Sequence, residues 1–165
     1  MDVILCDIYG KPIGKCEKLK AHREGMLHLA FSVFIFNSKK ELLLQKRSKE
    51  KYHSILKWSN TCCSHPMTQD ILNEAKLRLK KEMGIDTDIK VIFSFQYKAK
   101  VENLIENEFD YVFIGKYDKD PRPDDSEVDD FMWVSIADLI VEIKSTPDKF
   151  TPWLRLCIDE VSKFV

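Results

Sequence analysis

Residues 63–85 read CSHPMTQDILNEAKLRLKKEMGI, a polar loop followed by a segment with helical periodicity. Apolar side chains recur in this segment at intervals of three and four residues, which places them on one face of a helix. These side chains are Leu72, Ala75, Leu79 and Met83. Asp70 can accept a hydrogen bond from a free backbone amide of the first turn, and Gly84 can adopt the left-handed conformation that ends a helix. We therefore predict a helix over residues 70–83.

Runs with the composition of β-strands lie on both sides of this helix and predict a mixed sheet. The expected strands cover residues 2–8, 29–36 and 41–46, and lie near residues 91–97, 109–117 and 131–134. The turn sequence Asn37-Ser38-Lys39-Lys40 predicts that the second and third of these strands form a hairpin. Further helices are expected near residues 136–144 and 152–164. Because residues 121–126 form only a short surface loop, the pattern predicts a single α/β (α+β) domain over residues 1–165.

Charge and cysteine content limit the class of protein. The chain has 26 basic and 27 acidic residues and a net charge of −1, which argues against nucleic acid or an anionic membrane as the main partner. Its five cysteines follow no disulfide pattern and indicate reduced thiols. The N-terminus lacks the features of a signal peptide, and no apolar run approaches the roughly 20 residues of a membrane span. We expect a cytoplasmic protein, whose oligomeric state the sequence does not determine.

Residues 106–113, ENEFDYVF, carry acids at alternate positions leading into a predicted strand. Side chains two apart share a face, so Glu106, Glu108 and Asp110 would point one way. The aromatic side chains between and after them would point the other way, into the core; they are Phe109, Tyr111 and Phe113. The acidic face is either a solvated polar surface or a site for a hard cation or acid–base chemistry, because acids are disfavoured in strands. The segment alone leaves both interpretations open.

The chain has only four histidines. His22 and His28 precede the strand at 29–36, His65 follows Cys63 in a polar loop, and His53 stands apart in a charged loop. Imidazoles together with carboxylates suit a divalent ion such as Mn²⁺, Mg²⁺ or Zn²⁺. The spacing of Cys63 and His65 is too tight for a standard structural zinc pair. These two residues therefore indicate either a working site or a buried thiol beside a polar histidine.

Four cations could together hold a diphosphate, with arginine offering bidentate contacts. They are Lys18, Arg47, Lys51 and Arg78. Two of them also have simpler interpretations. Arg78 lies four residues before Glu82 and can form an ordinary helical ion pair, and Lys51 can be an exposed lysine of a charged loop.

The segment from Cys63 to Ile85 resembles a Nudix box, GX5EX7REUXEEXGU. Glu82, Gly84 and Ile85 match its last glutamate, its final glycine and its aliphatic residue. Most other positions are replaced: Cys63 stands for the opening glycine, Gln69 for the first glutamate, and Leu77, Arg78 and Lys81 for the Arg, Glu and Glu of the centre. Nudix hydrolases use these carboxylates to bind metals and the attacking water. The resemblance thus implies a Nudix fold, a mixed sheet sandwiched by helices, without most of its hydrolytic residues.

Four further motifs are similar to those of the type 1 isopentenyl-diphosphate isomerases, which share this fold. LHLAFS at 27–32, WSNTCCSHP at 58–66, ENE at 106–108 and TPW at 151–153 correspond to that family's LHxAFS, W/F-TNTCCSHP, ENE and SPW. The motifs occur in the same order, and the resemblance covers nearly the whole chain. It implies an isomerase that interconverts isopentenyl diphosphate and dimethylallyl diphosphate in isoprenoid biosynthesis.

The resemblance also implies a role for each matching position. A Mg²⁺, Mn²⁺ or Zn²⁺ ion would be held by His22, His28, His65, Glu106 and Glu108. A second Mg²⁺ would bridge Glu82 and the substrate diphosphate, which would contact Lys18, Arg47, Lys51 and Arg78. Cys63 and Glu108 would transfer protons, Tyr97 would hydrogen-bond to Glu108, and Trp153 would face a carbocation. Without the resemblance, Tyr97 could be a half-buried strand tyrosine and Trp153 an anchor at a helix start.

The implied reaction adds a proton to an unactivated alkene and removes one from the neighbouring carbon, so it needs an acid and a base on opposite faces of a five-carbon unit. From the sequence we expect Glu108 with Tyr97 to deliver the proton and Cys63 to accept one. Two rival functions are a Nudix hydrolase of a diphosphate and a non-catalytic diphosphate-binding domain. The missing carboxylates at Gln69, Arg78 and Lys81 argue against the first. The joint presence of a thiol, two acids, an indole and three histidines argues against the second.

Overall fold

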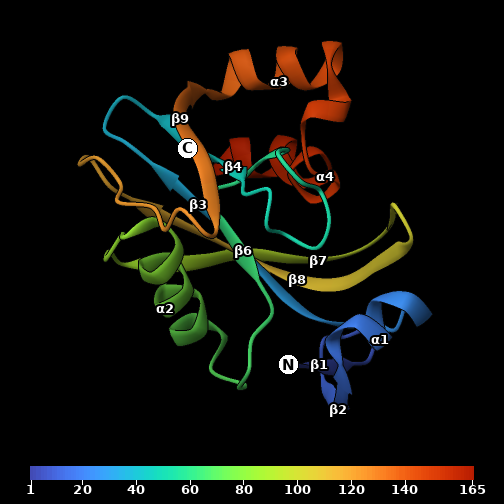
Figure 1. The fold of residues 1–165 in the computed structure, drawn as a ribbon. Coiled ribbons are helices and arrows are strands. Elements are labelled where there is room, and N and C mark those ends of the chain that lie inside the picture. The colour runs from blue at the N-terminus through green and yellow to red at the C-terminus, as the bar shows by residue number, and fades with distance from the viewer.

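Strand β3 (His28–Phe36) forms the centre of one curled sheet in the computed structural model, which describes residues 1–165 (Figure 1). All nine of its residues are buried. It pairs in parallel with β8 (Leu104–Lys116) along its whole length and in antiparallel fashion with β1, β4 and β6. The other strands extend the sheet to nine: β1 (Asp2–Cys6), β2 (Pro12–Glu17), β4 (Glu41–Arg47), β5 (Trp58–Ser59), β6 (Cys62–Ser64), β7 (Ile89–Val101) and β9 (Val128–Ser135).

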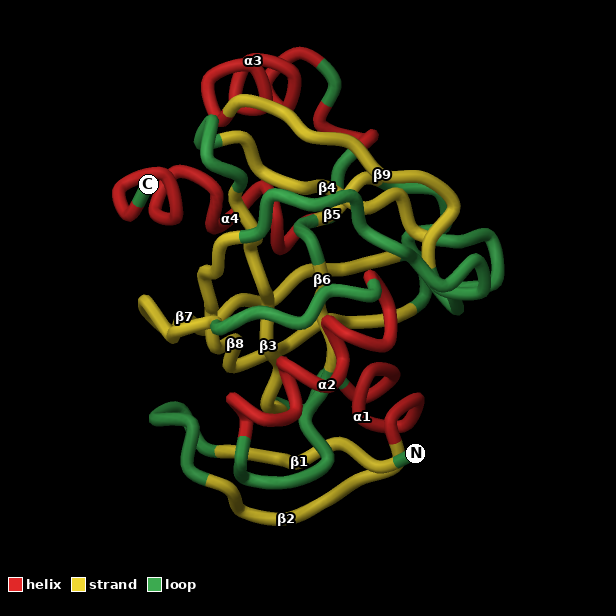
Figure 2. The backbone as a smooth tube through the Cα atoms, turned by 90° about the vertical axis from the view of Figure 1, so that its left-hand side faces the viewer, coloured by secondary structure: helices red, strands yellow, loops and turns green.

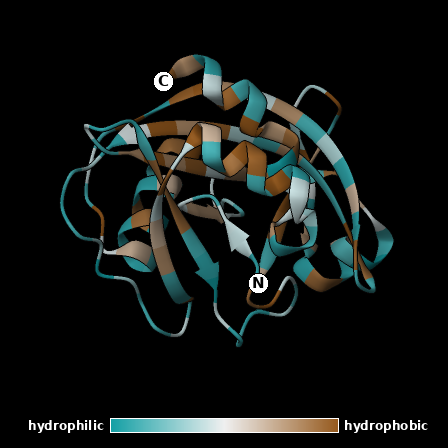
Figure 3. Ribbon diagram, turned by 90° about the horizontal axis from the view of Figure 1, so that it is seen from above, coloured by the Kyte–Doolittle hydropathy of each residue, from teal (hydrophilic) through white to brown (hydrophobic).

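Helices cover both faces of this sheet (Figures 1 and 2). On one face α2 (Ile71–Met83) packs through Ala75, Leu79 and Met83 against a core that includes Phe31 and Phe113. On the other face α3 (Ile136–Ser145) and α4 (Pro152–Val161) close a second core. Hydrophobic residues concentrate in the strands and in the helices beside them, whereas the surrounding loops are largely hydrophilic (Figure 3). The predicted mixed α/β fold, a sheet between helices, is confirmed.

The helix predicted from the opening stretch is present as α2, with both of its predicted ends. Asp70 accepts a hydrogen bond from the amide of Asn73 at 3.2 Å, and Gly84 lies in the left-handed region with φ of 65°. The predicted apolar face was wrong at one position, since Leu72 is 45% exposed. Glu82 is also buried on this helix, so α2 contributes a carboxylate beside the site.

Gly84 can be tested directly, because a side chain there meets a fixed backbone atom. A Cβ at this position would lie 2.6 Å from the carbonyl oxygen of Arg122. We expect Gly84→Ala to lower the free energy of unfolding by about 1–3 kcal/mol, from left-handed strain and this clash. Urea unfolding followed by circular dichroism measures the effect. Gly14→Ala is the matched control, since nothing lies within 4 Å of its Cβ; equal loss in both variants would contradict the prediction.

The predicted hairpin of β3 and β4 forms its turn but not its ladder. Only Phe36 and Leu42 are paired between the two strands, and beyond this pair the strands diverge. β4 continues instead beside β5 and β9, while β3 continues beside β6 and β8. The predicted hairpin is therefore confirmed at its turn and its first strand pair, but it does not extend into a longer ladder.

The segment at residues 59–62 fills the opening between β3 and β4. The hydroxyl of Thr61 accepts a hydrogen bond from the Ile35 amide at 2.9 Å and donates one to the Leu43 carbonyl at 2.6 Å. The amide of Asn60 donates to the carbonyls of Val33 and Cys62 at 3.1 and 2.8 Å. These buried side chains satisfy strand groups that a hairpin ladder would otherwise pair. They also fix the backbone that carries Cys63 and His65.

Several short elements have no counterpart in the predictions. They are β2, β5, β6, α1 (Lys18–Glu24) and the 3₁₀ turn η1 (Pro147–Lys149). The first predicted strand ends at Cys6, because Asp7 accepts hydrogen bonds from the amides of Tyr9 and Lys11 in a turn. The last predicted helix, near residues 152–164, is α-helical only to Val161 and continues as the 3₁₀ turn η2 (Ser162–Phe164). A bilayer could not be crossed by any of the helices, which are too short or too polar.

Candidate active site

One cavity gathers most of the residues singled out from the sequence. Its lining includes the four predicted catalytic residues, Cys63, Tyr97, Glu108 and Trp153, and the four predicted phosphate-binding cations, Lys18, Arg47, Lys51 and Arg78. His65 and Glu106 also line it. His22 and His28 lie fully buried behind this lining, and Glu82 is buried outside it.

The register of the sheet explains why these side chains meet. Tyr97 on β7 is opposite Glu108 on β8, which is opposite His28 on β3, so the three side chains share one face. Across the other edge of β3, Ser32 is opposite Cys63 of β6, and both side chains lie on the same face as His28. The thiol and the Glu108 carboxylate thus reach one cavity from strands on opposite edges of β3.

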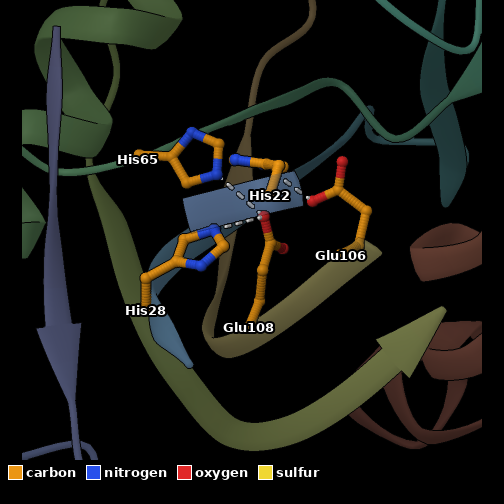
Figure 4. A group of neighbouring side chains, drawn as sticks. All are labelled: His22, His28, His65, Glu106 and Glu108. Carbon is orange, nitrogen blue, oxygen red and sulfur yellow. Dashed lines mark hydrogen bonds and ion pairs between the residues drawn. The ribbon is translucent and has the colours of Figure 1, made fainter. Parts of the chain in front are cut away.

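Five side chains form a group that we call the His/Glu cluster: His22, His28, His65, Glu106 and Glu108 (Figure 4). One ligand atom from each lies within 4.8 Å of all the others, and all five residues are buried. His22 Nε2 lies 3.2 Å from Glu106 Oε2. His28 and His65 point their Nε2 atoms at the same oxygen, Glu108 Oε1, at 3.7 and 2.9 Å. The sequence predicted this set from separate motifs, and the structure brings it together.

The hydrogen bonds of two histidines show that the cluster fits a cation. Nδ1 of His22 lies 2.7 Å from the Lys18 carbonyl, and Nδ1 of His28 lies 2.8 Å from the Met26 carbonyl. A carbonyl can only accept, so Nδ1 carries a proton in both rings, and the tautomer that can bind a cation is the one with its lone pair on Nε2. Both Nε2 atoms are buried without a hydrogen bond and face carboxylates. A divalent ion between these lone pairs would satisfy both groups.

The charge states of the cluster agree with this interpretation. Burial lowers the pKa of His65 to about 4, so its imidazole is neutral at neutral pH. Burial alone would raise the pKa of Glu108, but His28 and His65 hold it well below its usual range. Burial would also lower the pKa of His22, yet the adjacent Glu106 raises it overall. The cluster therefore has ionised carboxylates and attracts positive charge to the position between them.

The candidate proton-transfer groups have distinct surroundings. The Tyr97 hydroxyl donates a hydrogen bond of 2.5 Å to Glu108 Oε2, the oxygen that does not face the histidines. Burial raises the pKa of the Cys63 thiol to about 11, against the opposing effect of Arg47. Trp153 is 4% exposed, and its Nε1 donates to Ser59 and Asn60, which fixes the indole at the cavity wall. Trp153 is thus part of the cavity as well as the start of α4.

The four predicted phosphate-binding cations fall into two pairs. Lys18 and Arg47 form no ion pair with a carboxylate; Lys18 lies over the ring of Tyr52 and Arg47 over that of Trp153. Burial lowers the pKa of Lys18 to about 8. Arg47 is 5% exposed and its Nε has no partner. A buried guanidinium with a free donor is suited to an anionic ligand.

Lys51 and Arg78 are instead paired with carboxylates. Arg78 lies 2.5 Å from Glu82 and 2.9 Å from Glu127, and Lys51 contacts the same two acids. The simple helical ion pair of Arg78 and Glu82 is therefore present. Glu82 also accepts a hydrogen bond of 3.1 Å from Gln45. Glu82 belongs to this second group and not to the His/Glu cluster, so the two predicted metal positions are separate in the structure.

Comparison with known proteins identifies the family. The model of the NUDIX domain matches residues 26–154. Isopentenyl-diphosphate Delta-isomerase 1 of Aromatoleum aromaticum is 48% identical over 161 residues, which cover 96% of this chain and 91% of the relative. This chain belongs to the isopentenyl-diphosphate Delta-isomerase family. A Photorhabdus laumondii protein, isopentenyl-diphosphate Delta-isomerase 2, is 44% identical over 97% of this chain and 92% of its own length.

Solved structures support the fold of this family member at low sequence identity. DR0079 from Deinococcus radiodurans has a TM-score of 0.81 at 14% identity and covers 97% of this chain and 98% of its own. The MutT protein of Methanosarcina mazei has a TM-score of 0.67 at 17% identity, covering 83% and 94%. The likeness to these two proteins shows a Nudix fold and nothing about the substrate.

In this isomerase-family chain, the replaced positions of the Nudix box differ in whether their side chains line the cavity. Gln69, Leu77 and Lys81, which replace box residues, are all exposed and do not line the cavity. Of the replaced positions, only Cys63 and Arg78 line the cavity. The box therefore contributes a thiol and a cation to this site where the hydrolase pattern has glycine and glutamate.

The interpretation of the β8 acids as a solvated face was wrong. Glu106, Glu108 and Asp110 share one face as predicted, but that face is buried. Ser32 donates a hydrogen bond of 2.7 Å to Asp110, and burial raises the pKa of this acid above its usual range. Of the aromatic side chains on the other face, Phe113 is in the core, whereas Phe109 and Tyr111 are only half-buried.

Two further residues of the site were missed. Glu127 neutralises Lys51 and Arg78. His53 was expected to stand apart in a charged loop, but it is 3% exposed and lines the cavity. Neither lies in a periodic element or a motif, so their proximity to the site arises only from the path of the chain.

Proposed function

We propose that this chain interconverts isopentenyl diphosphate and dimethylallyl diphosphate, the reaction that the names of its relatives indicate. The observation that carries the proposal is the placement of Cys63 and Glu108. The two groups reach one cavity from opposite edges of β3, with Trp153 at its wall. Alkene migration needs proton donation to one carbon and proton removal from another, on either side of the carbon that bears the positive charge. Two groups on opposite sides of a five-carbon chain supply both.

The forward reaction adds one proton to the terminal carbon of the alkene and gives a tertiary carbocation. Loss of one proton from the neighbouring methylene then restores a double bond, so no net proton is consumed. The resting states of a thiol at Cys63 and a carboxylate at Glu108 suit delivery by Cys63 and acceptance by Glu108, with Tyr97 hydrogen-bonded to the acceptor. We thus propose the opposite order to that expected from the sequence. The reverse reaction exchanges the two roles.

The cavity also protects the charged intermediate. The indole face of Trp153 stabilises a nearby cation by roughly 1–2 kcal/mol when water is excluded. The buried position of Trp153 and the loop that carries Tyr52 and His53 limit the access of water to the cavity. Water would otherwise quench the carbocation. A divalent ion held by the His/Glu cluster, Mg²⁺ or else Mn²⁺ or Zn²⁺, would fix Glu108 in position and neutralise its charge. A second Mg²⁺ is proposed beside Glu82 and the diphosphate.

The proposal extends to location and partners. All five cysteines are free, which agrees with a reducing cytoplasm. The partner is a small diphosphate molecule, bound by Lys18 and Arg47 and by Lys51 and Arg78 from the second group. Because the last two are neutralised by carboxylates in the structure, we assign the larger share of diphosphate binding to the first two.

Arg47→Ala is expected to raise KM for isopentenyl diphosphate by about 10- to 100-fold, because it removes charged hydrogen bonds to the diphosphate, each worth about 1.5–3 kcal/mol. The change in kcat should be smaller. Steady-state kinetics measure both constants. Lys46→Ala is the matched control, since the neighbouring lysine pairs with Asp129 outside the cavity. An unchanged KM in Arg47→Ala would remove this residue from the diphosphate site.

The proposal is tested by offering the purified chain different diphosphates with Mg²⁺. We expect conversion of isopentenyl diphosphate to dimethylallyl diphosphate, seen by chromatography. We expect no phosphate or nucleotide release from diadenosine tetraphosphate or ADP-ribose. Hydrolysis of either nucleotide without alkene isomerisation would show a Nudix hydrolase, and the proposed function would be withdrawn.

A further inference from the structure

His53 contacts the His/Glu cluster from the loop between β4 and β5. Its Nε2 lies 2.7 Å from Glu106 Oε1, and its side chain is 4% exposed. This oxygen is the one that does not face His22, which instead lies 3.2 Å from Oε2. The Glu106 carboxylate is therefore held between two imidazoles, one inside the cluster and one outside it.

The geometry separates His53 from the five cluster residues. The ring centroid of His22 lies 4.7 Å from that of His28 and 5.2 Å from that of His65, but 6.4 Å from that of His53. The group of ligand atoms within 4.8 Å of one another does not include His53. His53 thus lies behind Glu106 as seen from the position that a cation would occupy.

The contacts of the ring define what His53 does to Glu106. Nδ1 lies 3.2 Å from the hydroxyl of Ser54, which can donate to it. The proton of the neutral ring is then on Nε2, which faces Glu106 Oε1 in an ion-pair contact of 2.7 Å without hydrogen-bond alignment. Ligands of metal ions are commonly oriented by such outer contacts, which fix the atom presented to the ion. With Oε1 facing His53, Oε2 is the oxygen left for a cation.

The loop holds His53 at this place through contacts on several sides. Arg47 Nη2 donates to the His53 carbonyl at 3.1 Å, and the ring lies edge-on to Trp153 with centroids 6.0 Å apart. The Ser54 amide donates to Glu102 Oε1 at 3.3 Å. Ser54 and Leu56 have positive φ values of 49° and 58°, a conformation that surrounding structure must maintain. The backbone is thus constrained at His53 and in the residues that follow it.

We propose that His53 is a positioning residue that orients Glu106 so that Oε2 faces the cation of the His/Glu cluster. The inference rests on the proposed metal centre and adds a residue that is not one of its ligands. Through its carbonyl, His53 also connects this centre to Arg47, a proposed diphosphate ligand. By linkage, pyrophosphate should tighten metal binding, and loss of His53 should weaken that coupling.

The test is calorimetric titration of the metal-free full chain with Mn²⁺, with and without inorganic pyrophosphate. Without pyrophosphate we expect one tight site in the unchanged chain and a loss of affinity at this site of about 10- to 100-fold in His53→Ala. His53→Gln should recover much of the affinity, because its amide nitrogen can contact Oε1 where Nε2 does. His53→Phe fills the space without a donor and should not. Ile55→Ala changes an exposed side chain of the same loop and controls for disturbance of the loop.

The outcomes separate the inference from the proposed function. If the unchanged chain binds no Mn²⁺ at the cluster, the metal centre and this inference both fall. If the unchanged chain binds and His53→Ala binds equally well, only the inference falls. Recovery by His53→Phe as complete as by His53→Gln would assign His53 a packing role and overturn the positioning role. The absorption spectrum of bound Co²⁺ gives a second readout, since a reoriented Glu106 changes its coordination; identical spectra in all variants would also overturn the inference.

Discussion

Replacement of Cys63 with alanine is expected to lower kcat by about a thousandfold or more while the chain stays folded. The thiol lines the cavity across β3 from Glu108, and none of the other four cysteines lines that cavity. A half-buried side chain of this size contributes little to the core, so the loss should come from the missing proton-transfer group. Steady-state isomerase assays measure the effect, and circular dichroism checks the fold.

Cys62→Ala provides the matched control for this prediction. Cys62 is the adjacent cysteine of β6, but its side chain points to the opposite face and is fully buried in the α2 core. Its replacement should lower stability through a small cavity and leave kcat within a few-fold. Full activity in Cys63→Ala would refute the catalytic assignment, whatever the control shows.

Glu108→Gln is expected to remove both metal binding and turnover. The carboxylate faces two imidazoles through Oε1 and receives the Tyr97 hydroxyl through Oε2, so one side chain serves the cluster and the proton transfer. The amide keeps the shape but loses the charge that a divalent ion requires. We expect kcat to fall by about a thousandfold or more and metal stoichiometry to fall toward zero. Elemental analysis after dialysis measures the second quantity.

Asp110→Asn is the control for Glu108→Gln, because Asp110 is the next acid on the same buried face of β8. It is hydrogen-bonded to Ser32 and lies outside the group of ligand atoms. The amide can still accept the hydrogen bond of Ser32, so the metal content should be unchanged. Normal turnover in Glu108→Gln would contradict its role, and equal metal loss in both variants would show a general effect of substitution on this buried face.

Local patterns predicted the elements whose ends and faces are set by the chain itself. Asp70 and Gly84 define α2 because capping depends on neighbouring backbone groups. Alternation along β8 predicted that Glu106 and Glu108 share a face. The same rule could not say that this face is buried, because burial depends on the helix, strands and loop that cover it. That information was absent from the strand and came only from the resemblance.

Contacts between distant segments explain what the sequence did not predict. Thr61 separates β3 from β4 with two hydrogen bonds of one hydroxyl, and no turn sequence predicts such an insertion. His53 reaches Glu106 across more than fifty residues because its loop folds back over the cavity. Its only local signal is a histidine beside Lys51 and Tyr52 in the segment before Trp58, and that signal is also typical of an exposed charged loop. Glu127 has no local signal at all.

The most direct test of the central claim is proton and phosphorus NMR of the purified chain with isopentenyl diphosphate and Mg²⁺ in D₂O. Proton addition at the terminal carbon and removal from the methylene beside the cationic carbon predict dimethylallyl diphosphate that carries deuterium, with the diphosphate intact and no free phosphate. Release of phosphate without alkene migration would contradict the isomerase and identify a hydrolase. An unchanged substrate in the presence of bound metal would also contradict it and leave a diphosphate-binding domain.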